Sequence, residues 1–411
     1  MQEITYCEVC GNTMLKPVLN LGMHPMCDDL VSVSDDRVCK NYSIEILFCP
    51  TCITGHQRYQ VPKRDLFPAS YHYRSRFTAD VLNGMRNLVE ACEKNFGNLS
   101  GKKVIDIGCN DGSLLGFFRE KGALTIGVEP TDAADDARLE GHAVYKDYLS
   151  ESVAQELVHK HGAPDLIIFT NVFAHIEDLA SLLRAIKRMM SENTAVVIEN
   201  HYLGSVLNGN QFDTFYHEHP RTYSYTSFVY IAFTLGVQIL DVDFPSRYGG
   251  NIRVFLGAPA KATGMDNSKS DSLDILEADF EAIFSQMNRN IDRWIINKST
   301  QLKVLIKQYG PLRAKAFPGR AAILIKLLDL DESSISAVYE KPGSLKIGHY
   351  LPGTRIPILS DDELMAMRDK SLPLLNLAWH IPKEIRAYLA GIGYTGPIID
   401  ILSTDDFLYR R

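Results

Sequence analysis

The chain has 411 residues, of which 45% are hydrophobic and 23% are charged. This composition is typical of a folded globular protein, and the length predicts about two to four domains. The formal net charge of −7 excludes a broadly basic surface, so we expect neither nucleic acid nor an anionic membrane as a partner. No apolar run reaches the roughly 18–20 residues of a membrane span, and no signal peptide pattern opens the chain. These features favour a cytoplasmic protein.

Two C-x-x-C pairs stand near the N-terminus, Cys7 with Cys10 and Cys49 with Cys52. Each pair can direct two thiolates at one tetrahedral Zn²⁺, so together they predict a closed Cys₄ site with a structural role. Residues 11–48 separate the pairs, a gap longer than the usual ribbon spacing of roughly 15–20 residues, which predicts an inserted loop. The alternative is a set of buried reduced cysteines or a single redox pair.

Short apolar runs alternate with helical patterns through the middle of the chain. The runs at 102–108, 124–128, 165–170 and 194–199 predict strands, and strands that alternate with helices indicate a parallel sheet in an α/β fold. Similar apolar runs recur within 311–411, which predicts a second α/β domain.

A linker and a long helix are predicted between these two α/β regions. Residues 258–272 are rich in Ala, Gly, Ser and Asp, which is typical of a linker. An apolar stripe at helical spacing then runs from Leu276 to Trp294 and predicts a helix packed on the core.

The turn after the first central strand has the features of a nucleoside site. Gly108 permits a tight turn between strand and helix, and Glu129 follows 21 residues later, close to the spacing of an acid that binds ribose hydroxyls. No G-x-G-x-x-G is present, and Asp106 and Asp111 would repel phosphate. A ligand that is neutral or cationic at its centre is therefore favoured, and S-adenosylmethionine fits; the alternative is an ordinary βα turn. The predicted donor-binding residues are Asp106, Gly108, Asn110, Asp111, Glu129 and Asn171.

At the Tyr216-His-Glu-His219 run, the chain resembles the zinc-containing S-adenosylmethionine-dependent C-methyltransferases of nucleotide-linked deoxysugars. The resemblance covers nearly the whole chain and includes the four cysteines, the donor turn and Tyr73 in its tyrosine-containing stretch. It implies an α/β protein with a small zinc-binding domain, a class I (Rossmann-like) methyltransferase domain and a Rossmann-like substrate domain. The corresponding boundaries are 1–60, 61–257, 258–310 for the linker and long helix, and 311–411.

The chain departs from this family at two places. The family's Gly-Gly-Ser-Leu-Arg stretch reads Gly249-Gly-Asn-Ile-Arg253 here, and its Ala/Gly-rich turn with a Lys reads Ala316-Phe-Pro-Gly-Arg320. The first departure bears on which sugar is bound. The second bears on the contact with the nucleotide and on which carrier the sugar is linked to. The predicted substrate-binding residues are Tyr73, His175, Asn251, Arg253, Arg320 and His349, of which the cations could contact phosphates or could be surface charges.

Methyl transfer to carbon requires a base at the C–H bond, a hydrogen-bond donor at the neighbouring ketone and an aligned methyl group. His219 is the predicted base, because an imidazole titrates near neutral pH. Glu218 could orient a catalytic group or act as the base itself, and Tyr216 could donate to the enolate oxygen. The alternative for each is a role in packing, although titratable side chains between Phe212 and Pro220 are unusual for a core.

The predicted function is therefore methylation of the carbon beside the ketone of a nucleotide-linked keto-deoxysugar, with S-adenosylmethionine as donor and a structural Zn²⁺. One alternative is an O- or N-methyltransferase acting on a sugar or a related small molecule. Another is a zinc-organised binding module with a vestigial methyltransferase domain. The sequence predicts no oligomeric state.

Overall fold

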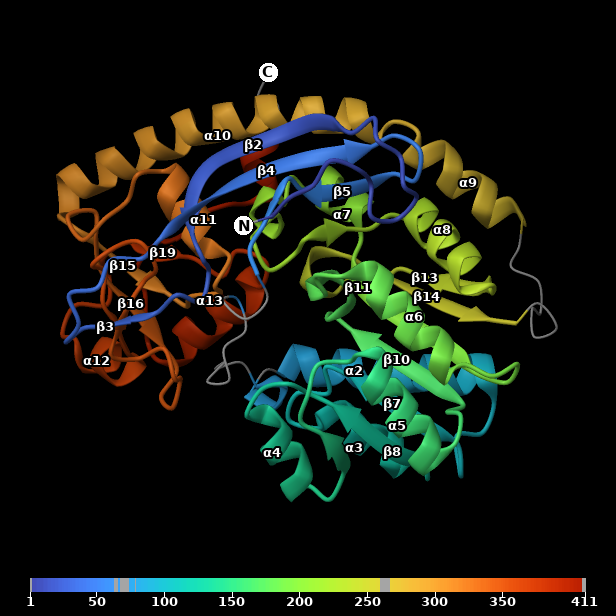
Figure 1. The fold of residues 1–411 in the computed structure, drawn as a ribbon. Helices are drawn as coiled ribbons and strands as arrows, with labels where there is room; N and C mark the ends of the chain where they lie inside the picture. Colours follow the sequence, from blue (N-terminus) through green and yellow to red (C-terminus); the bar gives the residue numbers. More distant parts are fainter. Residues whose placement is uncertain (1, 63–65, 67–73, 78, 259–266, 409–411) are drawn as a thin grey trace. The chain divides into compact units, whose positions relative to one another are not determined.

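The computed structural model describes residues 2–62, 66, 74–77, 79–258 and 267–408 (Figure 1). The chain divides into two compact units, each described here by itself. Unit 1 comprises Met1–Lys16, Leu47–Val206 and Glu218–Glu281, and unit 2 comprises Pro17–Ile46, Leu207–His217 and Ala282–Arg411. Within the described ranges, every helix is too short or too polar to cross a lipid bilayer.

Unit 1 contains a seven-stranded sheet in the order β13-β14-β11-β10-β7-β8-β9. The five strands from β11 to β9 are parallel, and β14 and β13 complete the sheet in antiparallel pairing. This confirms the predicted α/β class. The strands are β7 (Lys103–Ile107), β8 (Leu124–Val128), β9 (Ala143–Tyr145), β10 (Leu166–Thr170), β11 (Ala195–His201), β13 (Gln238–Asp243) and β14 (Asn251–Gly257).

Parallel crossovers are almost always right-handed, which places the helices of an open sheet with a switch in strand order on both of its faces. The helices of unit 1 are α2 (Ala79–Phe96), α3 (Ser113–Glu120), α4 (Ala133–Leu139), α5 (Glu151–His161), α6 (Leu179–Met189), α8 (Tyr225–Leu235) and α9 (Asn267–Glu277), while α7 (Leu203–Asn208) runs from unit 1 into unit 2. On one face, Met85 and Leu88 of α2 and Phe118 of α3 pack on Val104 and Val197 in one buried cluster. Burying each large apolar side chain contributes roughly 1.5–3 kcal/mol.

The order of the strands creates a topological switch point between β7 and β10. From β7 the chain proceeds to β8 and β9 on one side, and it then crosses to β10 and β11 on the other. Ligands of open α/β sheets bind in the crevice beyond the carboxyl ends of such strands. Gly108 and Asn171, which directly follow β7 and β10, lie at this point.

Short strands accompany the cysteine pairs. In unit 1, β1 (Gln2–Glu3) pairs with β6 (Tyr59–Gln60), and β5 (Thr54–Gln57) pairs with β12 (Arg221–Thr222). In unit 2, β3 (Val31–Ser32) pairs with β17 (His349–Tyr350). The longer strands β2 (Lys16–Pro25) and β4 (Asn41–Cys49) carry the chain across the boundary between the units.

Unit 2 contains a second parallel sheet, in the order β18-β16-β15-β19-β20. Its switch point lies between β15 and β19, because the chain moves from β15 outward to β18 and then returns to β19. The strands are β15 (Leu312–Lys315), β16 (Ile335–Glu340), β18 (Ile358–Ser360), β19 (Leu374–Asn376) and β20 (Ile398–Asp400). The helices are α10 (Phe280–Tyr309, whose first two residues belong to unit 1), α11 (Ala321–Leu327), α12 (Asp361–Ala366) and α13 (Pro382–Gly391).

The predicted linker and long helix need one correction. Residues 259–266 of the predicted linker lie outside the described residues, but its end is helical, because α9 begins at Asn267. A two-residue turn then separates α9 from α10. The prediction that the apolar stripe of the long helix begins at Leu276 is therefore wrong, because this residue lies on α9 and is 42% exposed. Ser and Asp suggested a loop here, yet both residue types are also favoured where helices begin.

Candidate functional site

The four cysteines of the two C-x-x-C pairs meet in unit 1. Their sulfur atoms all lie within 4.8 Å of one another, with 3.3 Å between Cys7 and Cys52 and 3.5 Å between Cys10 and Cys49. A tetrahedral Zn²⁺ with Zn–S bonds of about 2.3 Å requires sulfur separations of about 3.8 Å, so the cluster fits this ion. Hydrogen bonding with Cys49, together with burial, raises the pKa of Cys7 above its usual range. A divalent cation would offset this resistance to ionisation.

Both knuckles have the same backbone turn. The N–H of Gly11 donates to the carbonyl of Cys7 at 2.8 Å, and the N–H of Ile53 donates to that of Cys49 at 2.9 Å. Both residues after the second cysteine have positive φ, 79° at Gly11 and 54° at Ile53. Positive φ is unusual for a β-branched residue, so the second knuckle holds Ile53 in a strained conformation.

The N-terminus of α8 anchors the second knuckle. Ser224 caps this helix by accepting from the N–H of Ser227, and the Ser227 hydroxyl lies 3.1 Å from the carbonyl of Cys52 and 2.8 Å from the hydroxyl of Thr54. All three hydroxyl-bearing side chains are buried. The cysteine cluster is therefore attached to a helix of unit 1 by hydrogen bonds as well as by the chain.

The predicted donor turn follows β7 and depends on Gly108. This residue has φ of 74°, and a Cβ atom there would lie 2.6 Å from Cγ2 of Val172. Its N–H donates to the carbonyl of Val128 at 2.8 Å, which joins the turn to the end of β8. The close approach explains why glycine is required, and it puts the turn directly beside the residue that follows Asn171.

Two buried carboxylates face this turn. Glu129 accepts from the N–H of Asn110 at 3.1 Å through one oxygen and from the N–H and hydroxyl of Thr131, at 2.9 and 2.6 Å, through the other. Asp106 is 3% exposed, and burial together with the charge of Glu129 raises its pKa well above the ordinary value. An electropositive or hydrogen-bond-donating ligand would relieve this crowding of negative charge.

Asn110 and Asp111, also predicted to bind the donor, hold the chain segment that precedes α2. The amide oxygen of Asn110 accepts from the N–H of Ser75 at 3.0 Å, and one carboxylate oxygen of Asp111 accepts from the N–H of Arg76 at 2.9 Å. The other oxygen of Asp111 accepts from the N–H and the hydroxyl of Ser113 at the start of α3. In this structure both side chains therefore hold neighbouring backbone segments in place around the turn.

A buried carboxylate that sequence reasoning missed lies at the end of β11. Glu199 is fully buried and accepts from Arg247 at 3.2 Å, from Arg253 at 2.7 Å and from the amide of Asn251 at 3.0 Å. The same Asn251 amide also donates to the side-chain oxygen of Asn171 at 3.2 Å. Asn251 and Arg253, predicted to bind substrate, are thus engaged in a buried ionic network at the carboxyl edge of the sheet.

Three imidazoles gather beside Asn171. The 3₁₀ turn η2 (Phe173–His175) places His175 4.7 Å from His219, measured between ring centroids, and His201 at the end of β11 lies 5.1 Å from His219. Nδ1 of His175 donates to the carbonyl of Glu218 at 2.7 Å, and burial lowers the pKa of His175 to about 4. Glu218 and His219 are both 4% exposed. The structure thus brings His175, Glu218 and His219 to the edge that carries Gly108 and Asn171.

The first half of the Tyr-His-Glu-His run belongs to unit 2. His217 donates through Nε2 to the carbonyl of Tyr42 at 3.1 Å, and burial lowers its pKa to about 4. Tyr216 is partly buried. Residues 217–218 form a turn.

Two of the remaining predicted substrate residues, Arg320 and His349, belong to unit 2. Arg320, in unit 2, forms an ion pair with Asp213 at 3.4 Å and stacks over the ring of Trp379. His349 lies on β17, and its Nδ1 is 3.3 Å from the carbonyl of Ile347. Tyr73 lies outside the described residues.

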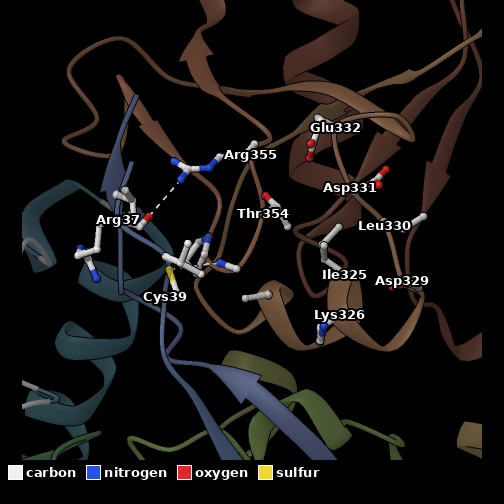
Figure 2. Close-up of a pocket in the computed structure, with 15 residues that line it drawn as sticks. Arg37, Cys39, Ile325, Lys326, Asp329, Leu330, Asp331, Glu332, Thr354 and Arg355 are labelled. Carbon is white, nitrogen blue, oxygen red and sulfur yellow. Dashed lines mark hydrogen bonds between the residues drawn. The ribbon is translucent and has the colours of Figure 1, made fainter. Parts of the chain in front are cut away.

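Unit 2 also has a pocket of about 340 Å³, drawn in Figure 2. Arg355 donates across it to backbone carbonyls of residues 35–37, and Asp331 and Glu332 lie on the far wall. Arg37 pairs with Asp29 beside it. None of the described residues predicted for the site lines this pocket, so we assign it no role in methyl transfer.

Comparison with known proteins matches nearly the whole chain. Residues 7–67 match a zinc binding domain family, residues 72–241 match a methyltransferase domain family, and residues 247–399 match the family of C-methyltransferase C-terminal domains. C-methyltransferase NovU of Streptomyces niveus is 26% identical over 400 residues, which cover 94% of this chain and 92% of that protein. The chain belongs to the zinc-containing, S-adenosylmethionine-dependent C-methyltransferases.

Two other similar proteins each cover less than half of this C-methyltransferase. A ubiquinone biosynthesis O-methyltransferase of Escherichia coli O139:H28 is 32% identical over 98 residues, 23% of this chain and 40% of that protein. A solved Burkholderia thailandensis 1,6-didemethyltoxoflavin-N1-methyltransferase is 14% identical and covers 49% of this chain and 94% of its own, with a TM-score of 0.37.

Sequence reasoning about the C-methyltransferase missed Glu199, His201, Asp213 and Trp379. A signal existed for the first two, because Glu199, Asn200 and His201 are polar residues that end the apolar run 195–198, where a parallel strand reaches the ligand edge. Asp213 and Trp379 are distant in sequence, and only the fold brings them together.

Proposed function

We propose that this C-methyltransferase methylates the carbon beside the ketone of a nucleotide-linked keto-deoxysugar. The observation that carries the proposal is the position of His219. Its buried imidazole lies against that of His175, which belongs to the turn that follows Asn171. That turn touches Gly108 through Val172, so an imidazole and the predicted donor turn occupy the same edge of the sheet. A base beside the methyl donor is the requirement for carbon methylation.

In the proposed mechanism, His219 removes the proton from the carbon beside the ketone. The negative charge passes to the ketone oxygen, where Tyr216 donates a hydrogen bond, and Glu218 orients the base or accepts the proton in its place. S-adenosylmethionine supplies the electrophilic methyl group when it is bound. His175 stays neutral near pH 7 because its pKa is about 4, so it adds no positive charge beside the base.

The nucleoside of the acceptor is proposed to bind at the parallel sheet of unit 2. In this sheet the N–H of Phe317, in the turn after β15, donates to Glu340 at the end of β16 at 2.6 Å. The N–H of Asn110 donates to Glu129 in the same topological position of unit 1. An acid at the end of the second strand is the usual ligand of ribose hydroxyls in such folds, which supports a nucleoside site here.

The proposal can be tested with the donor product S-adenosylhomocysteine, deuterated water and a nucleotide-linked 4-keto-6-deoxyhexose. We expect one ring C–H to exchange with solvent, detected by proton NMR, and we expect exchange to stop in His219→Ala. With S-adenosylmethionine present, the methyl group should appear on that carbon. A methyl group on oxygen or nitrogen, without exchange, would instead support the alternative methyltransferase.

A further inference from the structure

Three residues meet at the switch point of the unit 2 sheet and are not explained by packing alone. Arg320 lies in the turn after β15, Trp379 follows β19, and Asp213 belongs to η3 (Phe212–Thr214). The indole N–H of Trp379 donates to Oδ2 of Asp213 at 2.8 Å, and Nε of Arg320 lies 3.4 Å from the same oxygen. Nη1 of Arg320 donates to the hydroxyl of Thr214 at 3.0 Å. The edge between such strands is where α/β sheets bind ligands.

Two polar atoms of this cluster are left over. Oδ1 of Asp213 and Nη2 of Arg320 are buried and have no hydrogen-bond partner among the residues that the structure describes. The Asp213 side chain is fully buried and that of Arg320 is 9% exposed. Nε and Nη2 form one edge of a guanidinium, so the unmet donor lies on the edge that faces the carboxylate. An unmet donor and an unmet acceptor in one buried group each carry a substantial penalty unless a ligand or water satisfies them.

The charges of the cluster identify the kind of ligand. The positive charge of Arg320 is matched by the carboxylate of Asp213, so the pair offers no net charge to a phosphate, and Oδ1 would repel one. The two unmet atoms are one hydrogen-bond donor and one acceptor. A ligand that matches them is uncharged and both accepts and donates a hydrogen bond at adjacent positions. A sugar hydroxyl does both, and so does the imide edge of a uracil-type base.

We propose that Asp213, Arg320 and Trp379 form a binding site for an uncharged donor–acceptor edge of the acceptor substrate. In this site Oδ1 of Asp213 accepts from the ligand, Nη2 of Arg320 donates to it, and Trp379 holds the carboxylate in place. The inference rests on the proposed function and makes Arg320 a contact to a neutral group rather than to phosphate.

Asp213→Asn tests the site by calorimetry with a nucleoside diphosphate-linked 4-keto-6-deoxyhexose. The asparagine oxygen must still face the Trp379 N–H, so its amide group turns a donor toward the ligand where an acceptor is needed. We expect affinity to fall by roughly 10- to 100-fold, the share of one hydrogen bond to a charged group, while the affinity for S-adenosylmethionine is kept. Tighter binding would reveal a phosphate contact relieved of repulsion, and it would overturn the inference. Asp36→Asn, on the exposed loop of unit 2, is the matched control.

Two further arms complete the experiment. If Asp213→Asn lowers the affinity for the nucleoside diphosphate alone by the same factor, the ligand edge belongs to the base. If that affinity is unchanged, the edge is a sugar hydroxyl. Arg320→Lys retains the positive charge but lacks the planar edge, so it should weaken binding as well, and an unchanged affinity would overturn the inference. Wild-type binding of the nucleotide sugar tests the proposed function separately: absence of any binding overturns both, whereas binding that is indifferent to Asp213 overturns only the site.

Discussion

His219 is a buried imidazole between His175 and His201, and its substitution gives the most direct test at the scale of single residues. We expect His219→Ala to reduce turnover by roughly 10²–10⁴, the usual share of a general base. The dissociation constant of S-adenosylmethionine should stay nearly unchanged, because most of the predicted donor-binding residues lie in the segments that follow β7 and β8. Single-turnover kinetics and calorimetry provide the two measurements.

His159→Ala is the matched control for this prediction, since it removes an exposed imidazole from α5 in the same unit. It should leave both quantities unchanged. Normal turnover in His219→Ala would transfer the role of base to Glu218 or Tyr216. Loss of donor binding would instead assign His219 to the shape of the site.

The buried His217 predicts a dependence of stability on pH. Burial lowers its pKa from 6.5 to about 4. Between these values the unfolded chain binds a proton that the folded protein rejects, so this contribution to the free energy of unfolding is complete above pH 6.5 and is lost toward pH 4. From pH 7 to pH 5 the loss should be about 2 kcal/mol.

Urea unfolding at both pH values, in wild type and in His217→Gln, measures this contribution. Glutamine can still donate to the carbonyl of Tyr42 but does not titrate, so the variant should lose about 2 kcal/mol less than wild type on acidification. Zinc content should be followed in parallel, because acid also protonates cysteines. Equal losses in the two proteins would show that His217 is protonated equally well in the folded and unfolded chains.

Among the elements of the fold, the β7–α3 turn depends on one missing side chain. In Gly108→Ala, the new Cβ would lie 2.6 Å from Val172, at a residue whose φ is 74°. The turn and the residues after β10 would have to separate, so we expect the affinity for S-adenosylmethionine to fall at least about tenfold. Isothermal calorimetry measures this directly.

Gly101→Ala separates steric contact from backbone strain. Gly101 has a similar φ of 77°, but a Cβ there would meet nothing within 4 Å. The variant should lose about 1 kcal/mol of stability and retain its affinity for the donor. If both variants bind the donor like wild type, then the turn at Gly108 is not its binding site.

For the molecule as a whole, the sequence predicts features that depend on local spacing. The cysteine pairs, Gly108 and Glu129 each follow from a motif of a few residues, or from two neighbouring strands, and the α/β class follows from the alternation of elements. The network around Glu199 does not, because its arginines come from residues 247 and 253 and are brought to β11 only by sheet pairing. The pairing of Asp213 with Trp379 likewise spans 166 positions and has no local signature.

The zinc site gives a prediction at the scale of the whole chain. Its ligands flank residues 17–46, which belong to unit 2, so the metal fixes both ends of this insertion within unit 1. Without the cation, the four sulfurs cannot all ionise at such short separations, and the two knuckles lose their common centre. The long segment between them, which contains β2 and β3 and most of β4 rather than the predicted inserted loop alone, then gains conformational entropy that the metal had removed.

We therefore expect about one Zn per chain by metal analysis, and a melting temperature lower by roughly 5–15 °C after chelation. Limited proteolysis with mass spectrometry should show new cleavage between Gly11 and Phe48, and added Zn²⁺ should reverse it. Cys49→Ser should reproduce the effect, whereas Cys39→Ala removes a buried cysteine outside the cluster and should keep the metal. Folded protein that contains no zinc, and whose cleavage pattern is indifferent to chelation, would mean that hydrogen bonds from α8 alone hold the knuckles in place.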